Sequence, residues 1–127
     1  MAAFDVGKAI NPRALEGQIE GGVAMGLGYA LMEEVVIREG VIQNANLQDY
    51  MIPTALDVPD IQPVILEIAN ELGPYGANGI GEMPNIPATP AILNAICDAC
   101  GGRVRSLPAD PEKIFWAIRE AGGPPKE

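Results

Sequence analysis

The segment NPRALEGQIEGGVAMGLGYAL, residues 11–31, predicts a long helix. Asn11 suits the capping position of a helix, and the fixed φ of Pro12 suits the first helical residue. Apolar and small residues then recur at spacings of three and four, which is the pattern of one helix face. They are Leu15, Ile19, Gly22, Val23 and Gly26. We therefore expect a helix from about Pro12 to Leu31.

The glycines inside this predicted helix call for a physical reason. Each glycine in a helix interior costs up to about 1 kcal/mol relative to alanine. The helix contains Gly17, Gly21, Gly22, Gly26 and Gly28. One reason would be the close approach of another backbone or of a ligand, which a Cβ atom would block. The other would be tight packing of the helix against a sheet, and the sequence leaves both open.

The remaining segments predict short strands and two further helices. Runs rich in β-branched residues read as strands at residues 34–38, 41–43 and 64–68. A turn at Glu39-Gly40 joins the first two. A helix is expected from Pro87 to Cys100 with Gly101 as its C-cap, and another begins after Asp110. Because strands and helices do not alternate regularly, we expect an α+β fold, with a small mixed sheet and about three helices.

Length and charge limit the possible functions. The chain has 127 residues, which is enough for one domain. Its 17 acidic and 8 basic residues give a net charge of −9, whereas nucleic acid and anionic membranes attract positive surfaces. No run is long and apolar enough to cross a bilayer, and residues 1–5 lack a signal-peptide pattern. We expect a cytoplasmic domain without a nucleic-acid or membrane partner.

Residue types exclude several kinds of catalytic site. The chain has no histidine, which excludes Ser-His-Asp and Cys-His catalysis and the usual histidine metal sites within it. No metal ligands are expected. Cys97 and Cys100 form a C-x-x-C pair near the end of a predicted helix, whereas a thioredoxin-like pair begins one, so we expect buried structural cysteines. Scattered aromatic residues are expected to be core or interface anchors; they are Tyr29, Tyr50, Tyr75 and Trp116.

A glycine-rich loop, GPYGANGIGEMP at residues 73–84, follows the strand predicted at residues 64–68. Such a loop lets the backbone approach a ligand, but it matches neither a P-loop nor the dinucleotide fingerprint. Its carboxylate, Glu82, is framed in sequence by apolar residues: Met83, Pro84, Ile86 and Pro87. Apolar surroundings would raise the pKa of Glu82 and suit it to exchange protons near neutral pH. Alternatively, Glu82 only begins a helix or faces water.

Short motifs follow one another in order along nearly the whole chain. They are Asp5-Val6-Gly7, Ile10-Asn11-Pro12, Gly17-Gln18-Ile19-Glu20-Gly21-Gly22, Gly26-Leu27-Gly28, Glu33-Glu34, Ile52-Pro53-Thr54 after Tyr50, Asp57 with Pro59, Gly76-Ala77-Asn78-Gly79-Ile80-Gly81-Glu82, Pro90-Ala91-Ile92, Asn94-Ala95-Ile96, Leu107-Pro108 and Pro111-Glu112. This series resembles the xanthine dehydrogenase and aldehyde oxidase family, in the C-terminal part of its molybdopterin-binding (large) subunit.

The resemblance implies roles for individual residues. Glu82 matches the family's active-site base. Gln18 matches a glutamine that lies near the pterin cofactor, and the backbone of Gly79, Ile80 and Gly81 would line that cofactor. Asn78 stands where the family often has a lysine or another polar residue, which removes one positive charge near the site.

The resemblance also implies a reaction and cofactors. The reaction is hydroxylation of an aldehyde or an N-heterocycle, with water as the oxygen source. The cofactor is molybdenum-molybdopterin, with the cytosine dinucleotide form as one candidate, and iron–sulfur and FAD centres lie in partner domains or subunits.

The family's molybdenum-binding portion is several times longer than this chain. Residues 1–127 are therefore expected to form a single, incomplete domain, the C-terminal segment of the cofactor-binding domain. This segment would need the remainder of the molybdopterin subunit and would be inactive alone. The alternative is a non-catalytic assembly subunit, or a degenerate homologue that kept the fold.

Overall fold

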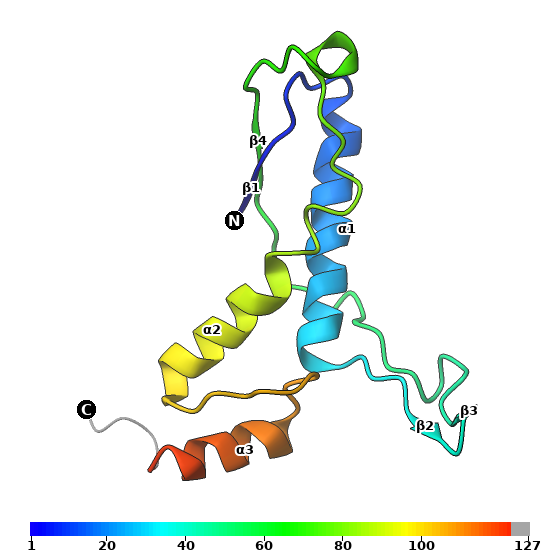
Figure 1. The fold of residues 1–127 in the computed structure, drawn as a ribbon, viewed down its shortest axis with the longest axis vertical. Coiled ribbons are helices and arrows are strands. Elements are labelled where there is room, and N and C mark those ends of the chain that lie inside the picture. Colours follow the sequence, from blue (N-terminus) through cyan, green and yellow to red (C-terminus); the bar gives the residue numbers. More distant parts are fainter. Residues whose placement is uncertain (123–127) are drawn as a thin grey trace.

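The computed structural model describes residues 1–122, arranged along one long helix (Figure 1). This helix, α1, spans Pro12–Leu31, as predicted. The side chain of Asn11 accepts a hydrogen bond from the Ala14 N–H at 3.2 Å, and Pro12 is the first helical residue. The local cap signal is therefore confirmed, and α1 gives the molecule an axis about 30 Å long.

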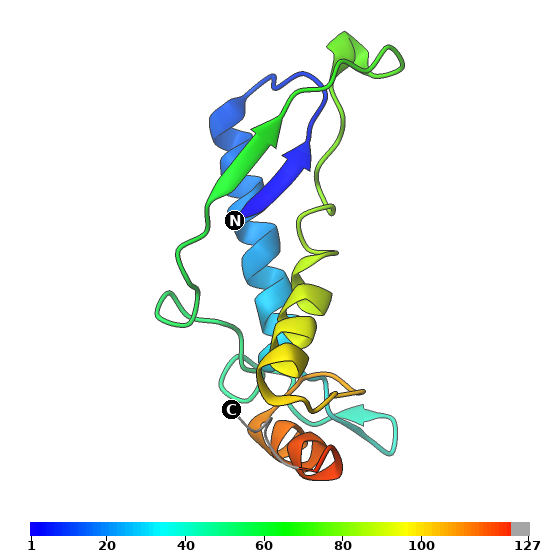
Figure 2. The ribbon, with the colours of Figure 1, turned by 90° about the vertical axis from the view of Figure 1, so that its left-hand side faces the viewer.

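Two strands distant in sequence pair beside the N-terminal half of α1 (Figure 2). Strand β1, Ala2–Asp5, runs parallel to β4, Pro63–Leu66, with Ala2 opposite Pro63 and Asp5 opposite Leu66. Strand β4 corresponds to the strand predicted at residues 64–68. No strand was expected at residues 2–5, because only Phe4 there favours β structure.

A small core lies between this strand pair, α1 and the glycine-rich loop. Val6 follows β1, Ile19 lies on α1 and Ile80 belongs to the loop, and all three are buried together. Partly buried apolar residues surround them: Ala2, Phe4, Ala9, Leu15, Val23, Ile65 and Met83. The loop is therefore part of the hydrophobic core.

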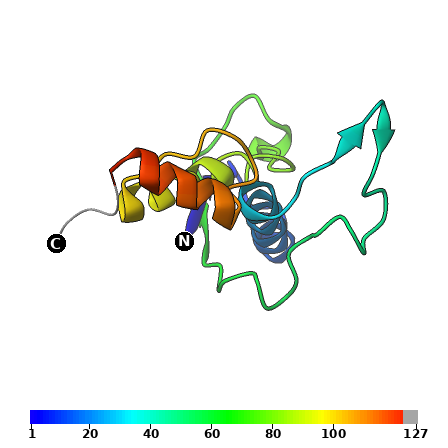
Figure 3. The same ribbon diagram turned by 90° about the horizontal axis from the view of Figure 1, so that it is seen from below.

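Two helices complete the other end of the molecule. Helix α2, Ala88–Cys100, ends at Gly101 in the left-handed conformation with φ 72°, which confirms the predicted C-cap. Helix α3, Pro111–Glu120, begins after Asp110, whose side chain accepts a hydrogen bond from the Lys113 N–H at 2.8 Å. Seen from below, α3 lies across this end of the molecule (Figure 3).

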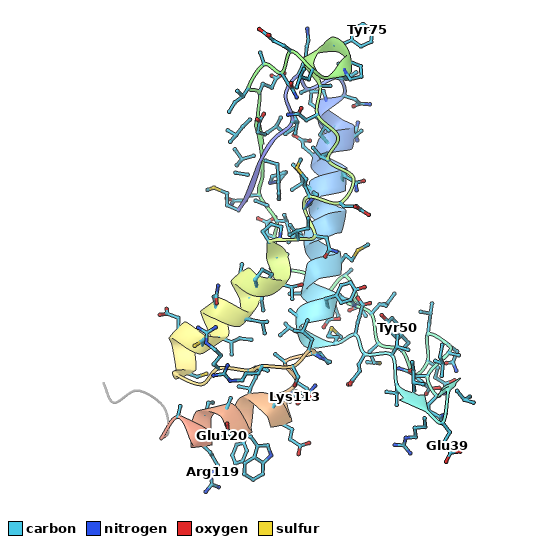
Figure 4. The ribbon with its side chains drawn as sticks, viewed as in Figure 1. Glu39, Tyr50, Tyr75, Lys113, Arg119 and Glu120 are labelled. Carbon is cyan, nitrogen blue, oxygen red and sulfur yellow. The ribbon has the colours of Figure 1, made fainter. Side chains whose placement is uncertain are left out.

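The remaining strands form a hairpin that projects from the molecule (Figure 3). Strand β2, Ile37–Arg38, pairs antiparallel with β3, Val41–Ile42. The turn contains Glu39 and Gly40 as predicted, both with positive φ, and Glu39 marks the hairpin tip in Figure 4. These strands are shorter than predicted because their residues are exposed and pack against no second layer.

The α+β class and the three helices are confirmed. In residues 1–122 the strands form two separate two-stranded ladders, one parallel and one antiparallel. A short 3₁₀ turn, η1, occupies Pro74–Gly76. Cys97 and Cys100 are free, but they are half-buried where we expected them to be buried, because α2 has no fully buried residue.

Candidate functional site

The glycine-rich loop runs beside α1, in the same direction as the helix. The Gln18 side-chain Nε2 donates a hydrogen bond to the Gly81 carbonyl oxygen at 2.6 Å. One helical turn further along, Gly22 lies against Pro84, and after another turn Gly26 lies against Ala88. One face of α1 therefore contacts the chain from Gly81 to the start of α2.

Glycines on α1 make this close approach possible. A Cβ atom on Gly22 would lie 2.5 Å from Pro84 Cβ, and one on Gly26 would lie 2.5 Å from Ala88 Cβ. Both distances are too short for real carbon atoms, so close approach of another segment accounts for these two glycines. For Gly17 and Gly21 a Cβ atom would meet nothing within 4 Å, and the structure gives no reason for them.

The segment from Asn78 to Glu82 is held at several points. The Asn78 N–H donates to the Val6 carbonyl oxygen at 2.8 Å, and the Glu82 carbonyl oxygen accepts from the Asn85 N–H at 3.1 Å. Between them, Ile80 is buried in the core with 5% of its surface exposed. Gly79, Gly81 and Glu82 are exposed. The loop thus presents a fixed backbone and one carboxylate at the surface.

The surroundings of Glu82 differ from the sequence expectation. Pro84 is buried and Met83 is half-buried, but Ile86, Pro87 and the Glu82 residue itself are exposed. The apolar neighbours in sequence point partly inward toward α1 and do not enclose the carboxylate. Glu82 also precedes α2 by several residues, so it does not begin a helix. Within residues 1–122 it faces water, and any apolar cover must come from another part of the protein.

All five residues singled out from the sequence lie in one place. Four of them are consecutive in the loop, from Gly79 to Glu82. The hydrogen bond from Gln18 to the Gly81 carbonyl joins α1 to this segment across 63 positions of sequence. Their individual roles stay predictions.

A polar contact beside the loop was not expected. The Asn70 Nδ2 donates to Asn78 Oδ1 at 2.5 Å, which directs the Asn78 side chain toward Asn70. Asn70 carries no sequence signal beyond its polar type after a strand, so sequence reasoning had no means to find this pair.

The loop has room for a ligand on its outer side. A Cβ atom added to Gly79 or Gly81 would meet nothing within 4 Å, so the backbone there is open to approach. Residues 1–122 contain no group of three or more His, Cys, Asp or Glu side chains that could hold a metal ion. The donor set fits a cofactor that brings its own metal ligands and contacts the chain through backbone groups and Gln18.

An apolar groove of about 380 Å³ lies away from the Glu82 carboxylate, between β1, α1, α2 and residues 58–61. Phe4, Val23 and Ile92 are among the residues that line it. Pro84 and Pro87 also line it, but Glu82 does not. The groove therefore reaches the end of the loop at Pro84 but is not lined by Glu82. Among the described residues, none of the helices has the length and apolar character to cross a membrane.

Comparison with known proteins indicates the family of the chain. Residues 1–59 match a family described as the molybdopterin cofactor-binding domain. The chain is 40% identical over 120 residues to the xanthine dehydrogenase molybdenum-binding subunit of Escherichia coli O157:H7, covering 93% of this chain and 16% of that subunit. It is 39% identical over 116 residues to the aldehyde oxidoreductase of Megalodesulfovibrio gigas, covering 91% of this chain and 12% of that protein.

Comparison of the fold with solved structures leads to the same family. The crystal structure of quinoline 2-oxidoreductase from Pseudomonas putida 86 matches with a TM-score of 0.85 and 40% identity, over 93% of this chain and 16% of that chain. The chain therefore spans about one sixth or less of the length of these relatives. By its sequence and by its fold, the chain belongs to the xanthine dehydrogenase and aldehyde oxidase family of molybdenum-binding subunits.

Proposed function

We propose that this chain is part of a molybdenum-containing hydroxylase that uses Glu82 as its active-site base. The substrate would be an aldehyde or an N-heterocycle, and water would supply the oxygen. The observation that carries the proposal is the position of Glu82 at the end of a loop that is anchored to α1 and open on its outer side. Molybdopterin is the cofactor of the family.

The chain's own residues would place the base and line the cofactor. When bound, the cofactor would supply the redox chemistry, which includes taking up the hydrogen and the two electrons of the substrate C–H bond that breaks. Glu82 would take a proton from the water-derived nucleophile as a carbon–oxygen bond forms. Gln18 and the backbone of Gly79, Ile80 and Gly81 would contact the pterin. None of these contacts requires a metal ligand from this chain.

The exposure of Glu82 supports a site completed by other parts of the enzyme. We propose that residues 1–127 form the C-terminal segment of the cofactor-binding domain, a single domain that is incomplete alone and inactive in isolation. The rest of the molybdopterin subunit would cover Glu82 and hold most of the cofactor, with the cytosine dinucleotide form as one candidate. Iron–sulfur and FAD partners would carry the electrons away, and the cytoplasmic location stays a prediction.

Replacement of Glu82 by glutamine in the intact enzyme tests the proposal. The amide keeps the shape of the side chain but cannot accept the proton. Turnover should fall by a factor on the order of 10² to 10⁴ while the molybdenum content stays unchanged. Glu20→Gln, an exposed glutamate on α1, is the matched control and should keep full activity. Near-normal turnover in Glu82→Gln would reject the base assignment and favour a non-catalytic assembly subunit.

A further inference from the structure

We propose that Gln18 is a positioning residue for the proposed base, acting through the backbone of Gly81. Its side-chain amide holds the Gly81 carbonyl and so fixes the peptide plane that leads into Glu82. This inference rests on the proposed role of Glu82. It assigns to Gln18 a function besides contact with the pterin.

The chemistry of the contact defines its direction. The Gly81 carbonyl oxygen can only accept a hydrogen bond, so the Gln18 atom 2.6 Å away must be the donating Nε2. The Gln18 Oε1 is then left to accept a hydrogen bond from another group. Both residues are exposed, so the bond persists only while α1 and the loop stay aligned.

The peptide group between Gly81 and Glu82 explains why one bond can orient the base. The peptide is planar, so its carbonyl and the Glu82 N–H point in opposite directions. Fixing the carbonyl toward α1 therefore fixes the Glu82 N–H away from α1, together with the position of the Glu82 Cα, which lies in the same plane. Gly81 has no side chain, and an added Cβ atom would meet nothing within 4 Å, so packing around a side chain does not restrict this plane.

Other contacts hold the loop on each side of this peptide, and the Asn85 N–H bond to the Glu82 carbonyl restrains the peptide that follows it. Ile80 is buried beside Ile19, the residue that follows Gln18 on α1. On the other side, Pro84 lies against Gly22. These two apolar contacts hold the chain before and after the Gly81–Glu82 peptide, and the Gln18 bond lies between them.

The test replaces Gln18 by methionine in the intact enzyme, which keeps the length of the side chain but removes the amide. Glu16→Met is the matched control, because Glu16 is also an exposed polar residue of α1, two positions away. The measurements are molybdenum content, amide hydrogen exchange of Asn78 and Asn85, whose N–H groups donate to Val6 and Glu82, the values of kcat and KM, and the pH profile of kcat.

In Gln18→Met we expect exchange of the Asn78 and Asn85 amides to become about tenfold faster, because losing one hydrogen bond makes opening of the loop easier. We expect kcat to fall about five- to tenfold with KM and molybdenum content unchanged, and the limb of the pH profile that reports the base to shift. Glu16→Met should resemble the wild type. Gln18→Asn, one methylene shorter, should not restore kcat.

Three results would overturn the positioning role. Unchanged exchange and unchanged kcat would show that the bond does not matter. Loss of molybdenum with unchanged exchange would make Gln18 a cofactor ligand only. Faster exchange with unchanged kcat would show that the loop moves without consequence for the base. Failure of the proposed function is distinct, because it appears as full activity in Glu82→Gln.

Discussion

Gly21 and Gly22 are adjacent on α1 but have different surroundings. Gly22 is buried, and an added Cβ atom would lie 2.5 Å from Pro84 Cβ and 3.1 Å from the Asn85 nitrogen. Gly21 is exposed, and an added Cβ atom would meet nothing within 4 Å. The two neighbouring glycines therefore differ: a side chain would clash with the loop at Gly22 and would fit without contact at Gly21.

The two alanine variants should change stability in opposite directions. Gly22→Ala must push Pro84 away from α1 and should lower the free energy of unfolding by about 1–3 kcal/mol. Gly21→Ala only improves helix propensity and should raise it by up to about 1 kcal/mol. Thermal unfolding of the intact enzyme, with molybdenum content as a second readout, measures both. Equal effects of the two variants would contradict the close approach of the loop to α1.

Local signals at single residues could be predicted from the sequence. A capping residue determines where a helix begins or ends through contacts with its nearest neighbours. All three predicted caps are found as expected: Asn11, Gly101 and Asp110. For Glu82 the sequence left two possibilities open, apolar surroundings or exposure to water, and the structure has it exposed. Pro84 turns toward α1 whereas Ile86 and Pro87 are exposed, and these directions depend on contacts between segments distant in sequence, such as Ile80 with Ile19.

At the scale of elements, α1 and β4 could be predicted from local patterns, whereas β1 could not. A helix of this length carries its own hydrogen bonds, so spacing and caps define it. Strand β1 exists because β4 lies beside it, about 60 positions further along, and this pairing leaves no local pattern. The hairpin β2–β3 was found by its turn, but its length depends on packing that the described residues do not provide.

A side-chain hydrogen bond joins the segment after the hairpin to the residues that follow α1. The Tyr50 hydroxyl donates to Glu33 Oε2 at 2.6 Å, and Figure 4 shows Tyr50 close to that end of the helix. The Glu33 carboxylate in turn lies against Gly28 on α1. This hydrogen bond holds the residues near Tyr50 against the end of α1, although those residues form no helix or strand.

The hydrogen bond to Glu33 raises the pKa of Tyr50 above its ordinary value of 10.0. A raised pKa means that folding favours the protonated phenol. The stabilisation is therefore fully present below pH 10.0 and is lost as pH rises through the raised value. Tyr50→Phe should lower the melting temperature of the enzyme by a constant amount at pH 7 to 9, and the difference should vanish at higher pH.

Tyr75→Phe provides the control for this experiment. Tyr75 is 89% exposed and lies at the opposite end of the molecule from Tyr50 (Figure 4). Its variant should melt like the wild type at every pH. A difference between Tyr50→Phe and wild type that persists unchanged above the raised pKa would contradict the role of the Tyr50–Glu33 hydrogen bond.

For the whole molecule, the solvent-accessible surface is large for its mass. The solvent-accessible surface is 9073 Å² for a mass of 13.4 kDa. A compact monomer of that mass should expose about 6,500 Å², so the excess is about 2,600 Å². Interfaces within permanent complexes bury on the order of 2,000–5,000 Å² in total, which is about 1,000–2,500 Å² on each partner. The excess on this chain is therefore at the upper end of what one side of a permanent interface buries.

The core is correspondingly small. Within residues 1–122 the buried hydrophobic residues are Val6, Ile19, Ala30, Ile80, Ala109 and Ala117, half of them alanines. Large apolar side chains lie outside instead: Leu56 is 98% exposed and Leu72 is 96% exposed. Trp116 and Tyr29 are also about half exposed, so these anchors are available to an interface and are not part of the core.

The chain produced alone should therefore not behave as a stable monomer. We expect it to bind a dye specific for exposed apolar surface, to self-associate on size exclusion and to unfold without a sharp transition. Co-expression with the remaining part of a molybdenum-binding subunit should abolish dye binding and give a single cooperative transition, because the same apolar side chains would be covered. Leu56→Ser together with Leu72→Ser should reduce self-association of the isolated chain, whereas Glu16→Gln together with Glu20→Gln, on an exposed polar face, should not. An isolated chain that is monomeric, binds no dye and melts cooperatively would show that these residues form a complete domain.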